Sequence, residues 1–238
     1  MIGAGLLAVK FGFSGLESLP EAAKLHPELI DWVKLVQTIV SLGAFIIPAL
    51  VYSYLEEGNW FSFSTLNQAP KAIPSVLSVV IVFTAAPAIM WVLYVNQNIA
   101  FPESMVVLEN WLKSMERSTE ELMSAVISMK TPIDLVINMF VIAMVPALGE
   151  ELLFRGTFQK ILQRVSKDPH LAILVSGFVF SCFHLQFYGF FPRFFLGVLF
   201  GYLFWWSGKI WIPIFAHFVH NGVQVILIYL SDHGHICL

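Results

Sequence analysis

The strongest constraint on this chain is a series of long apolar runs separated by short polar gaps. The runs are Trp32–Leu55, Ser75–Val95, Ile133–Leu148, Leu171–Phe183, Phe190–Trp206 and Ile210–Leu230. An α-helix needs about 20 apolar residues to cross the bilayer core, and it satisfies its own backbone polar groups, as lipid requires. The runs are too long and too continuous for the strands of a membrane barrel. They predict an all-α, multi-pass membrane protein.

Composition supports this interpretation. Only 12% of the 238 residues are charged and 58% are hydrophobic, whereas a soluble domain is about 25% charged and about 45–50% apolar. At about 20 residues per span, a bundle of about seven or eight helices uses most of the chain, so we expect one transmembrane domain over residues 1–238. The apolar start, Met1–Phe13, is a candidate for a further short span. The net charge of −3 argues against a nucleic-acid partner.

Residues 102–130 differ from the rest because charged and apolar side chains alternate at helical spacing. This pattern predicts an amphipathic, extramembrane helix or helical hairpin at the membrane interface. The strongest basic cluster lies at Arg155–Lys167, and basic loops favour the cytoplasmic side. We therefore expect residues 102–130 on the opposite side of the membrane, with Arg193 as an exception to the charge rule on that side.

Ionisable residues beside or within apolar runs are expensive in a membrane and indicate functional sites. Glu150, Glu151 and Arg155 directly follow the run that ends at Leu148. On a helix, Glu151 and Arg155 are four residues apart and can form an ion pair, whereas Glu150 points about 100° away. Two adjacent carboxylates in unequal environments can hold different pKa values. The spacing alone is equally compatible with ordinary charges at a cytoplasmic helix end.

Two further polar positions stand out. His184 ends an apolar run, and taken alone it is more typical of a helix end than of a catalytic site. His217 and Asn221 share one face of an apolar span, which indicates either a functional site or hydrogen bonds between helices. Gly197 and Gly201 form a G-x-x-x-G pattern, which predicts close helix packing.

In order along the chain, these residues form the motifs Glu150-Glu151-x-x-x-Arg155, Phe180-x-x-x-His184 and His217-x-x-x-Asn221. They resemble the motifs of the CPBP intramembrane proteases, also called the Abi family, which includes type II CAAX prenyl proteases and bacteriocin-processing or self-immunity proteins. The intervening segment is similar at Phe195, Gly197, Gly201, Ser207, Gly208, Trp211 and Pro213. The resemblance covers roughly residues 146–222 and implies an all-α bundle with a protease-like core, expected here over residues 132–230.

The resemblance also implies roles for the motif residues. Glu150 would be the general base that activates water, assisted by His184, and a carboxylate in a partly desolvated cavity suits that role. His217 and Asn221 would stabilise the tetrahedral oxyanion. Glu151 and Arg155 would pair and orient the first motif. Because no serine or cysteine stands in the context of a nucleophile, direct attack by water is the simplest mechanism.

The resemblance leaves metal dependence open. Glu150, His184 and His217 have the composition of a catalytic zinc site, but the sequence lacks the H-E-x-x-H pattern, and we favour a glutamate mechanism without metal or cofactor. The competing functions are non-catalytic bacteriocin self-immunity and a transporter or proton relay. The expected partners are membrane lipid and a peptide or lipidated-protein substrate. The expected location is a bacterial cytoplasmic membrane.

Overall fold

The computed structural model describes residues 28–60, 66, 68 and 70–236. The candidate span Met1–Phe13 lies outside these residues. Every regular element in the described residues is a helix, and five of the helices are long and apolar enough to cross a membrane. The predicted all-α class with several membrane-spanning helices is therefore confirmed.

Two spanning helices precede the motif region. The first covers Glu28–Glu56 and is built from α3 (Glu28–Ser41), the π-helical turn η2 (Leu42–Ile46) and α4 (Ile47–Glu57). The second is α5 (Ala72–Gln97), which keeps Pro87 in its interior. Neighbouring helices allow such a proline in a membrane helix because they satisfy the backbone groups that it frees.

The third spanning helix, Pro132–Ser166, carries the first motif. It consists of α7 (Pro132–Asn138), η5 (Met139–Met144), α8 (Val145–Glu151), η6 (Leu152–Phe158) and α9 (Gln159–Ser166). Thr131 and Asp134 form a capping box that starts it, with Pro132 inside the first turn. The segments η5 and η6 are π-helical, a rare geometry that is frequent at functional sites. Here η6 begins directly after Glu151 and contains Arg155.

The remaining spanning helices are α11 (Phe190–Ser207) and α12 (Trp211–Asp232), preceded by the shorter apolar helix α10 (Pro169–Cys182). Glycines bring α10 and α11 together: a Cβ on Gly197 would lie 3.0 Å from the Cα of Gly177. A Cβ on Gly201 would lie 2.9 Å from side-chain atoms of Gln159 and of Ile173. The close approach predicted from the G-x-x-x-G pattern is confirmed.

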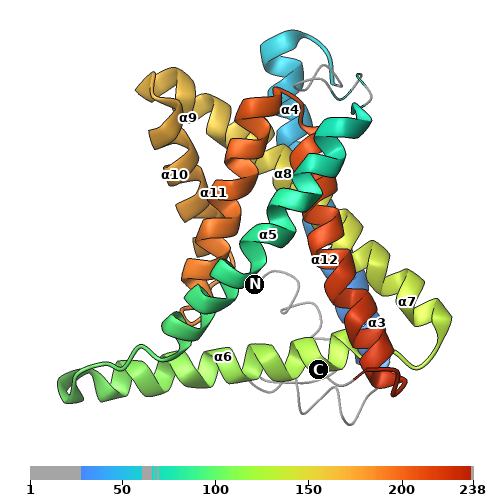
Figure 1. Cartoon of the computed structure of the whole chain (residues 1–238), viewed down its shortest axis with the longest axis vertical. Coiled ribbons are helices and arrows are strands. Elements are labelled where there is room, and N and C mark those ends of the chain that lie inside the picture. Colours follow the sequence, from blue (N-terminus) through green and yellow to red (C-terminus); the bar gives the residue numbers. More distant parts are fainter. Residues whose placement is uncertain (1–27, 61–65, 67, 69, 237–238) are drawn as a thin grey trace.

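The amphipathic stretch forms the 3₁₀ turn η4 (Glu103–Met105) and one continuous helix, α6 (Val106–Ile127), so the helix and not the hairpin is present. In Figure 1, α6 lies across one end of the bundle, and α9, which carries Lys160 and Arg164 of the basic cluster, lies near the other end. The two segments are thus separated as the sequence predicts. Which end faces the cytoplasm stays a prediction.

Candidate active site

A buried ion-pair cluster lies on the third spanning helix. Arg155 Nη1 donates to Glu151 Oε1 at 2.9 Å, and both side chains are 0% exposed. The predicted pair, four residues apart, is therefore present. His217 Nδ1 donates to the same Glu151 oxygen at 2.8 Å, so the cluster joins α12 to the third helix. We name the side chains of Glu151, Arg155 and His217 the buried cluster.

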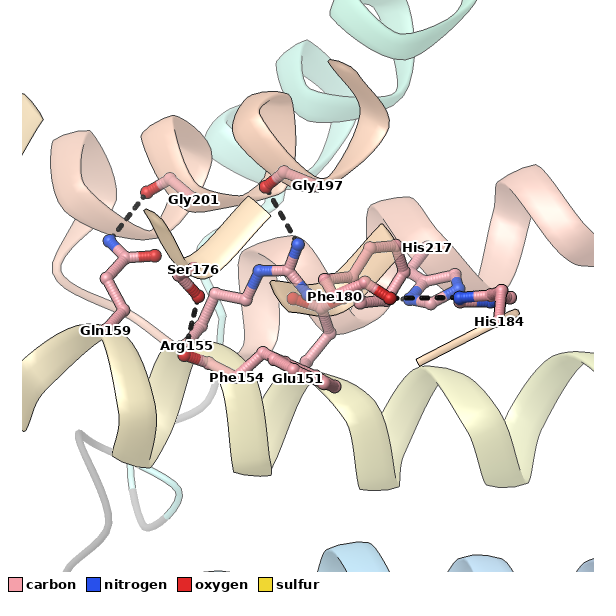
Figure 2. A network of polar contacts seen from close by, with 10 residues as sticks. All are labelled: Glu151, Phe154, Arg155, Gln159, Ser176, Phe180, His184, Gly197, Gly201 and His217. Atoms are coloured by element: carbon pink, nitrogen blue, oxygen red, sulfur yellow. Dashed lines mark hydrogen bonds and ion pairs between the residues drawn. The ribbon is translucent and has the colours of Figure 1, made fainter. Parts of the chain in front are cut away.

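Arg155 also ties this helix to α11. Its Nη2 donates to the Gly197 carbonyl at 2.8 Å, and Gln159 Nε2, one turn later, donates to the Gly201 carbonyl at 3.2 Å. Figure 2 shows these two side chains reaching the same helix. The missing glycine side chains leave room for both contacts, because a Cβ on Gly201 would collide with Gln159.

Phe180, the first residue of the second motif, lies between the polar groups. Its ring is 5.0 Å from the His184 ring and 6.3 Å from the His217 ring, measured between centroids. The guanidinium carbon of Arg155 lies 4.7 Å from the centroid of the same ring, a cation–π distance. The phenyl group therefore connects the second motif to the other two.

His184 lies just beyond α10, outside the spanning helices. Its Nδ1–H donates to the Phe180 carbonyl at 3.0 Å, so in a neutral ring Nε2 keeps a free lone pair. Burial lowers the pKa of His184 to about 4, and the positive charge of the nearby Arg193 acts in the same direction. At neutral pH, His184 can therefore accept a hydrogen bond from a water molecule.

Glu150 differs from its neighbour Glu151. Its side chain is half-buried, and among the described residues no hydrogen bond or ion pair reaches it. It lies within electrostatic range of His217 and Arg193, and His184 is within that range of the same two residues. The structure thus brings three of the four predicted catalytic residues to one region, and only Glu150 among them has a carboxylate to offer to a ligand.

Asn221, the fourth predicted residue, is half-buried on α12, one turn from His217. Its Nδ2 donates to the Ile142 carbonyl in η5 at 3.3 Å. One amide hydrogen is engaged in that contact, which orients the side chain and leaves the second hydrogen available. The adjacent His220 bonds to Gln224 on its own helix.

In the described part of the chain, no three His, Cys, Asp or Glu side chains are grouped as ligands for one ion. In the alternative zinc set, His217 and His184 use Nδ1 for hydrogen bonds to Glu151 and to a backbone carbonyl, so Nε2 is the nitrogen of each ring that could bind an ion. The glutamate mechanism without metal stays a prediction.

Three residues that sequence reasoning missed hold the loop between α10 and α11. Asn96 of α5 donates to the Phe187 carbonyl at 3.2 Å and accepts from Phe191 N at 3.0 Å. Glu116 of α6 accepts from Tyr188 N at 3.0 Å. The third, Arg193, donates to Gln186. These contacts fix the segment that carries His184, and no local spacing in the sequence signals them.

A cavity of about 290 Å³ opens between α6 and this loop. Its lining is mostly apolar and includes Trp111, Met115, Leu185 and Phe187, with Glu116 and Gln186 as polar members. Because Gln186 also holds Arg193, the cavity adjoins the group of charged side chains around Glu150.

Residues 132–223 match a family model described as Rce1-like, type II CAAX prenyl endopeptidase Rce1-like. This stretch contains all three motifs and ends just after Asn221. Less than half of the chain is matched, and the match shows that this segment is similar to the Rce1-like family. It agrees with the CPBP resemblance of the three motifs. No curated protein and no solved structure matches the chain.

Proposed function

We propose that this protein is an intramembrane endopeptidase that hydrolyses a peptide bond near the C-terminus of a prenylated, CAAX-type substrate, with Glu150 as the general base. The observation that carries the proposal is the contrast between two adjacent carboxylates. Both Arg155 and His217 bond to Glu151, whereas Glu150 is half-buried, lies within electrostatic range of His217 and has no bonded partner in the described residues.

In this mechanism, a water molecule donates one hydrogen bond to Glu150 and one to Nε2 of His184. Glu150 takes the proton as the water oxygen attacks the scissile carbonyl carbon. The resulting tetrahedral intermediate carries a negative oxygen. When the C–N bond breaks, the proton on Glu150 passes to the leaving amine, so that one water is consumed for each bond cleaved.

The oxyanion needs fixed donors in a site that excludes water. The second amide hydrogen of Asn221 is one such donor, since the first is held by the Ile142 carbonyl. His217 is the other. Because its Nδ1–H is bonded to Glu151, His217 donates from Nε2 only when its ring carries both protons. Glu151 therefore positions the imidazole.

Replacing Glu150 by glutamine tests this function. The substrate is an S-farnesylated peptide ending in a CAAX sequence, presented in vesicles with purified protein. We expect Glu150→Gln to reduce cleavage by at least about 10³-fold, with a melting temperature close to wild type because no contact is lost. Glu109→Gln, which removes a carboxylate that is 16% exposed and pairs with Lys113 on α6, is the matched control and should cleave normally.

Cleavage by Glu150→Gln within a few-fold of wild type would contradict the proposed base. Zinc is measured in the same preparations. Stoichiometric zinc whose removal abolishes cleavage would contradict the metal-free version of the mechanism. A self-immunity scaffold makes a third prediction, since its protective phenotype would survive the substitution.

A further inference from the structure

Arg193, near the start of α11, is a half-buried cation with no acidic partner among the described residues. Its Nη2 donates to the neutral Gln186 side chain. Its Nη1 is buried and has no hydrogen-bond partner among the described residues. No ion pair to Arg193 is present in the same part of the chain, although Glu116 and Glu150 lie within electrostatic range.

The position of this guanidinium is built into the loop. A Cβ on Gly189 would lie 2.1 Å from Arg193 Nη1 and 2.9 Å from its Cζ, so only glycine at position 189 allows the guanidinium to lie there. Gln186, three residues earlier in the same loop, holds the other end. The guanidinium is therefore held beside the site by two contacts, neither of which neutralises its charge.

Desolvating a cation without a counter-ion is costly, and a guanidinium with an open N–H is suited to bind a carboxylate or phosphate through paired hydrogen bonds. This arrangement indicates an anionic ligand. A substrate cleaved near its C-terminus brings such a group, because its terminal carboxylate lies a few residues beyond the scissile bond. Three extended residues span roughly 10 Å, so the terminal carboxylate can lie about that far from the scissile bond. This distance is similar to the range over which charges interact at physiological salt.

We propose that Arg193 binds the free C-terminal carboxylate of the substrate and so selects peptides that end shortly after the scissile bond. This inference rests on the proposed endopeptidase function and adds a specificity determinant to it. The contact exists in the substrate complex and the transition state alike, so removing it should raise KM and leave kcat almost unchanged.

The test compares two S-farnesylated CAAX peptides that differ only at the C-terminus, one a free acid and the other an amide. We expect the wild-type protein to cleave the acid with a kcat/KM about 10–100-fold higher, through KM, as the loss of a charged hydrogen bond implies. Arg193→Gln should remove this preference, so that the acid is cleaved no better than the amide. Arg117→Gln, which alters an exposed arginine of α6, should keep the preference.

Gly189→Ala supplies a second variant that retains the charge. The added Cβ displaces the end of the arginine side chain, which is flexible, so the fold should survive. The acid preference should fall as in Arg193→Gln. Equal cleavage of both peptides by the wild-type protein would overturn the inference. An acid preference that survives in Arg193→Gln would do so too.

A lipid phosphate is the other source of an anion. Assays in phosphatidylcholine vesicles and in vesicles containing phosphatidylglycerol separate the two. The acid preference should be the same in both, and an Arg193 effect confined to the anionic vesicles would overturn the inference. If the wild-type protein cleaves neither peptide, the endopeptidase proposal fails. Arg193 is then tested independently by calorimetry, which measures how the Glu150→Gln variant binds the AAX tripeptide of the CAAX sequence as acid and as amide. Tighter binding of the acid supports the inference, and equal binding overturns it.

Discussion

Two groups of polar residues lie next to each other in this bundle, and they differ in burial and in hydrogen bonding. The buried cluster of Glu151, Arg155 and His217 is almost fully removed from solvent and bonded internally. The second group, Glu150, His184 and Arg193, is half-buried, and no direct bond joins its members. Glu150 and Glu151 are consecutive residues, so a single step along the helix separates a structural carboxylate from one that is free to react.

The difference shows how a membrane protein can hold charges for two purposes. A buried charge costs little only when its partners are fixed in place, and the buried cluster meets that condition by joining three helices. A reactive charge must keep an unused proton or lone pair, and it must therefore be held by contacts elsewhere. Here Asn96 and Glu116 bond to the backbone of the His184 loop, not to its imidazole.

The largest effect is expected from breaking the buried cluster. Arg155→Ala leaves Glu151 buried with only His217 as a partner, and it also removes the bond to the Gly197 carbonyl. The loss of one partner from a buried pair costs about 3–5 kcal/mol. Unfolding in mixed detergent micelles should show this loss of stability, together with a lower yield of folded protein.

The exposed pair on α6 is the matched control. Arg117 and Glu121 have the same four-residue spacing, but their side chains are 81% and 42% exposed. Exposed pairs contribute about 0–1 kcal/mol, so Arg117→Ala should leave the unfolding free energy close to wild type. Equal losses in the two variants would show that the Arg155 pair contributes no more than a surface pair.

Asn221→Ala probes the reactive group. If the amide stabilises the oxyanion, kcat should fall by about 10²–10³, or about 2.7–4 kcal/mol, with little change in KM. The lost contact with the Ile142 carbonyl is a single hydrogen bond, so the effect on stability should be smaller, about 1 kcal/mol. A rise in KM at unchanged kcat would contradict the oxyanion role, and a large drop in melting temperature with normal turnover would indicate polar packing.

The local part of this arrangement could be predicted from the sequence. Apolar run lengths gave the spanning helices, and four-residue spacing gave the pair between Glu151 and Arg155. The G-x-x-x-G pattern gave the close packing around Gly197. Each of these depends on periodicity within one helix, which residue spacing encodes directly.

The partners across helices could not be predicted. His217 bonds to Glu151 over 66 residues of sequence, and Asn96 bonds to Phe187 over 91. Apolar runs set no register between one helix and another, so the sequence gives no reason to pair a particular asparagine with a particular loop. The sequence marked Arg193 only as an exception to the charge rule for the same reason, because its contacts come from the loop that folds around it.

Gly197→Ala tests whether both groups depend on the close packing of α10 against α11. The new Cβ would lie 3.0 Å from the Cα of Gly177 and 3.0 Å from Phe180 Cδ1. Because the backbone contact cannot yield by a rotamer change, we expect a loss of about 1–3 kcal/mol in unfolding free energy. Displacement of Phe180, whose ring contacts His184 and His217, should also reduce kcat.

Gly43→Ala is the control for this change. Gly43 lies in the π-helical turn η2, and no atom would lie within 4 Å of an added Cβ. Alanine favours a helix over glycine by up to about 1 kcal/mol, so this variant should be as stable as wild type or slightly more so. A Gly197→Ala variant with the stability and turnover of Gly43→Ala would show that α10 and α11 can separate without disturbing the site.

The smallest expected effect near physiological pH is the contribution of His184 to the pH dependence of the unfolding free energy. Its pKa of about 4 lies below the usual value of 6.5, so the unfolded chain binds more protons than the folded protein between these two values. The unfolding free energy should therefore fall as pH drops from about 6.5 to 4, and His184 should contribute almost no pH dependence between pH 7 and 8.

The imidazole itself can be followed by NMR in protein with ¹³C-labelled histidine rings, its signal assigned through its absence in His184→Gln. We expect the ring to stay neutral down to about pH 5. A midpoint near pH 6.5 would mean that the ring is solvated, and one above pH 7 would mean that it is paired with an anion. In the second case His184 would be mainly cationic at neutral pH, it could not accept a hydrogen bond from the attacking water, and the division between a charged buried cluster and a neutral histidine in the second group would fail.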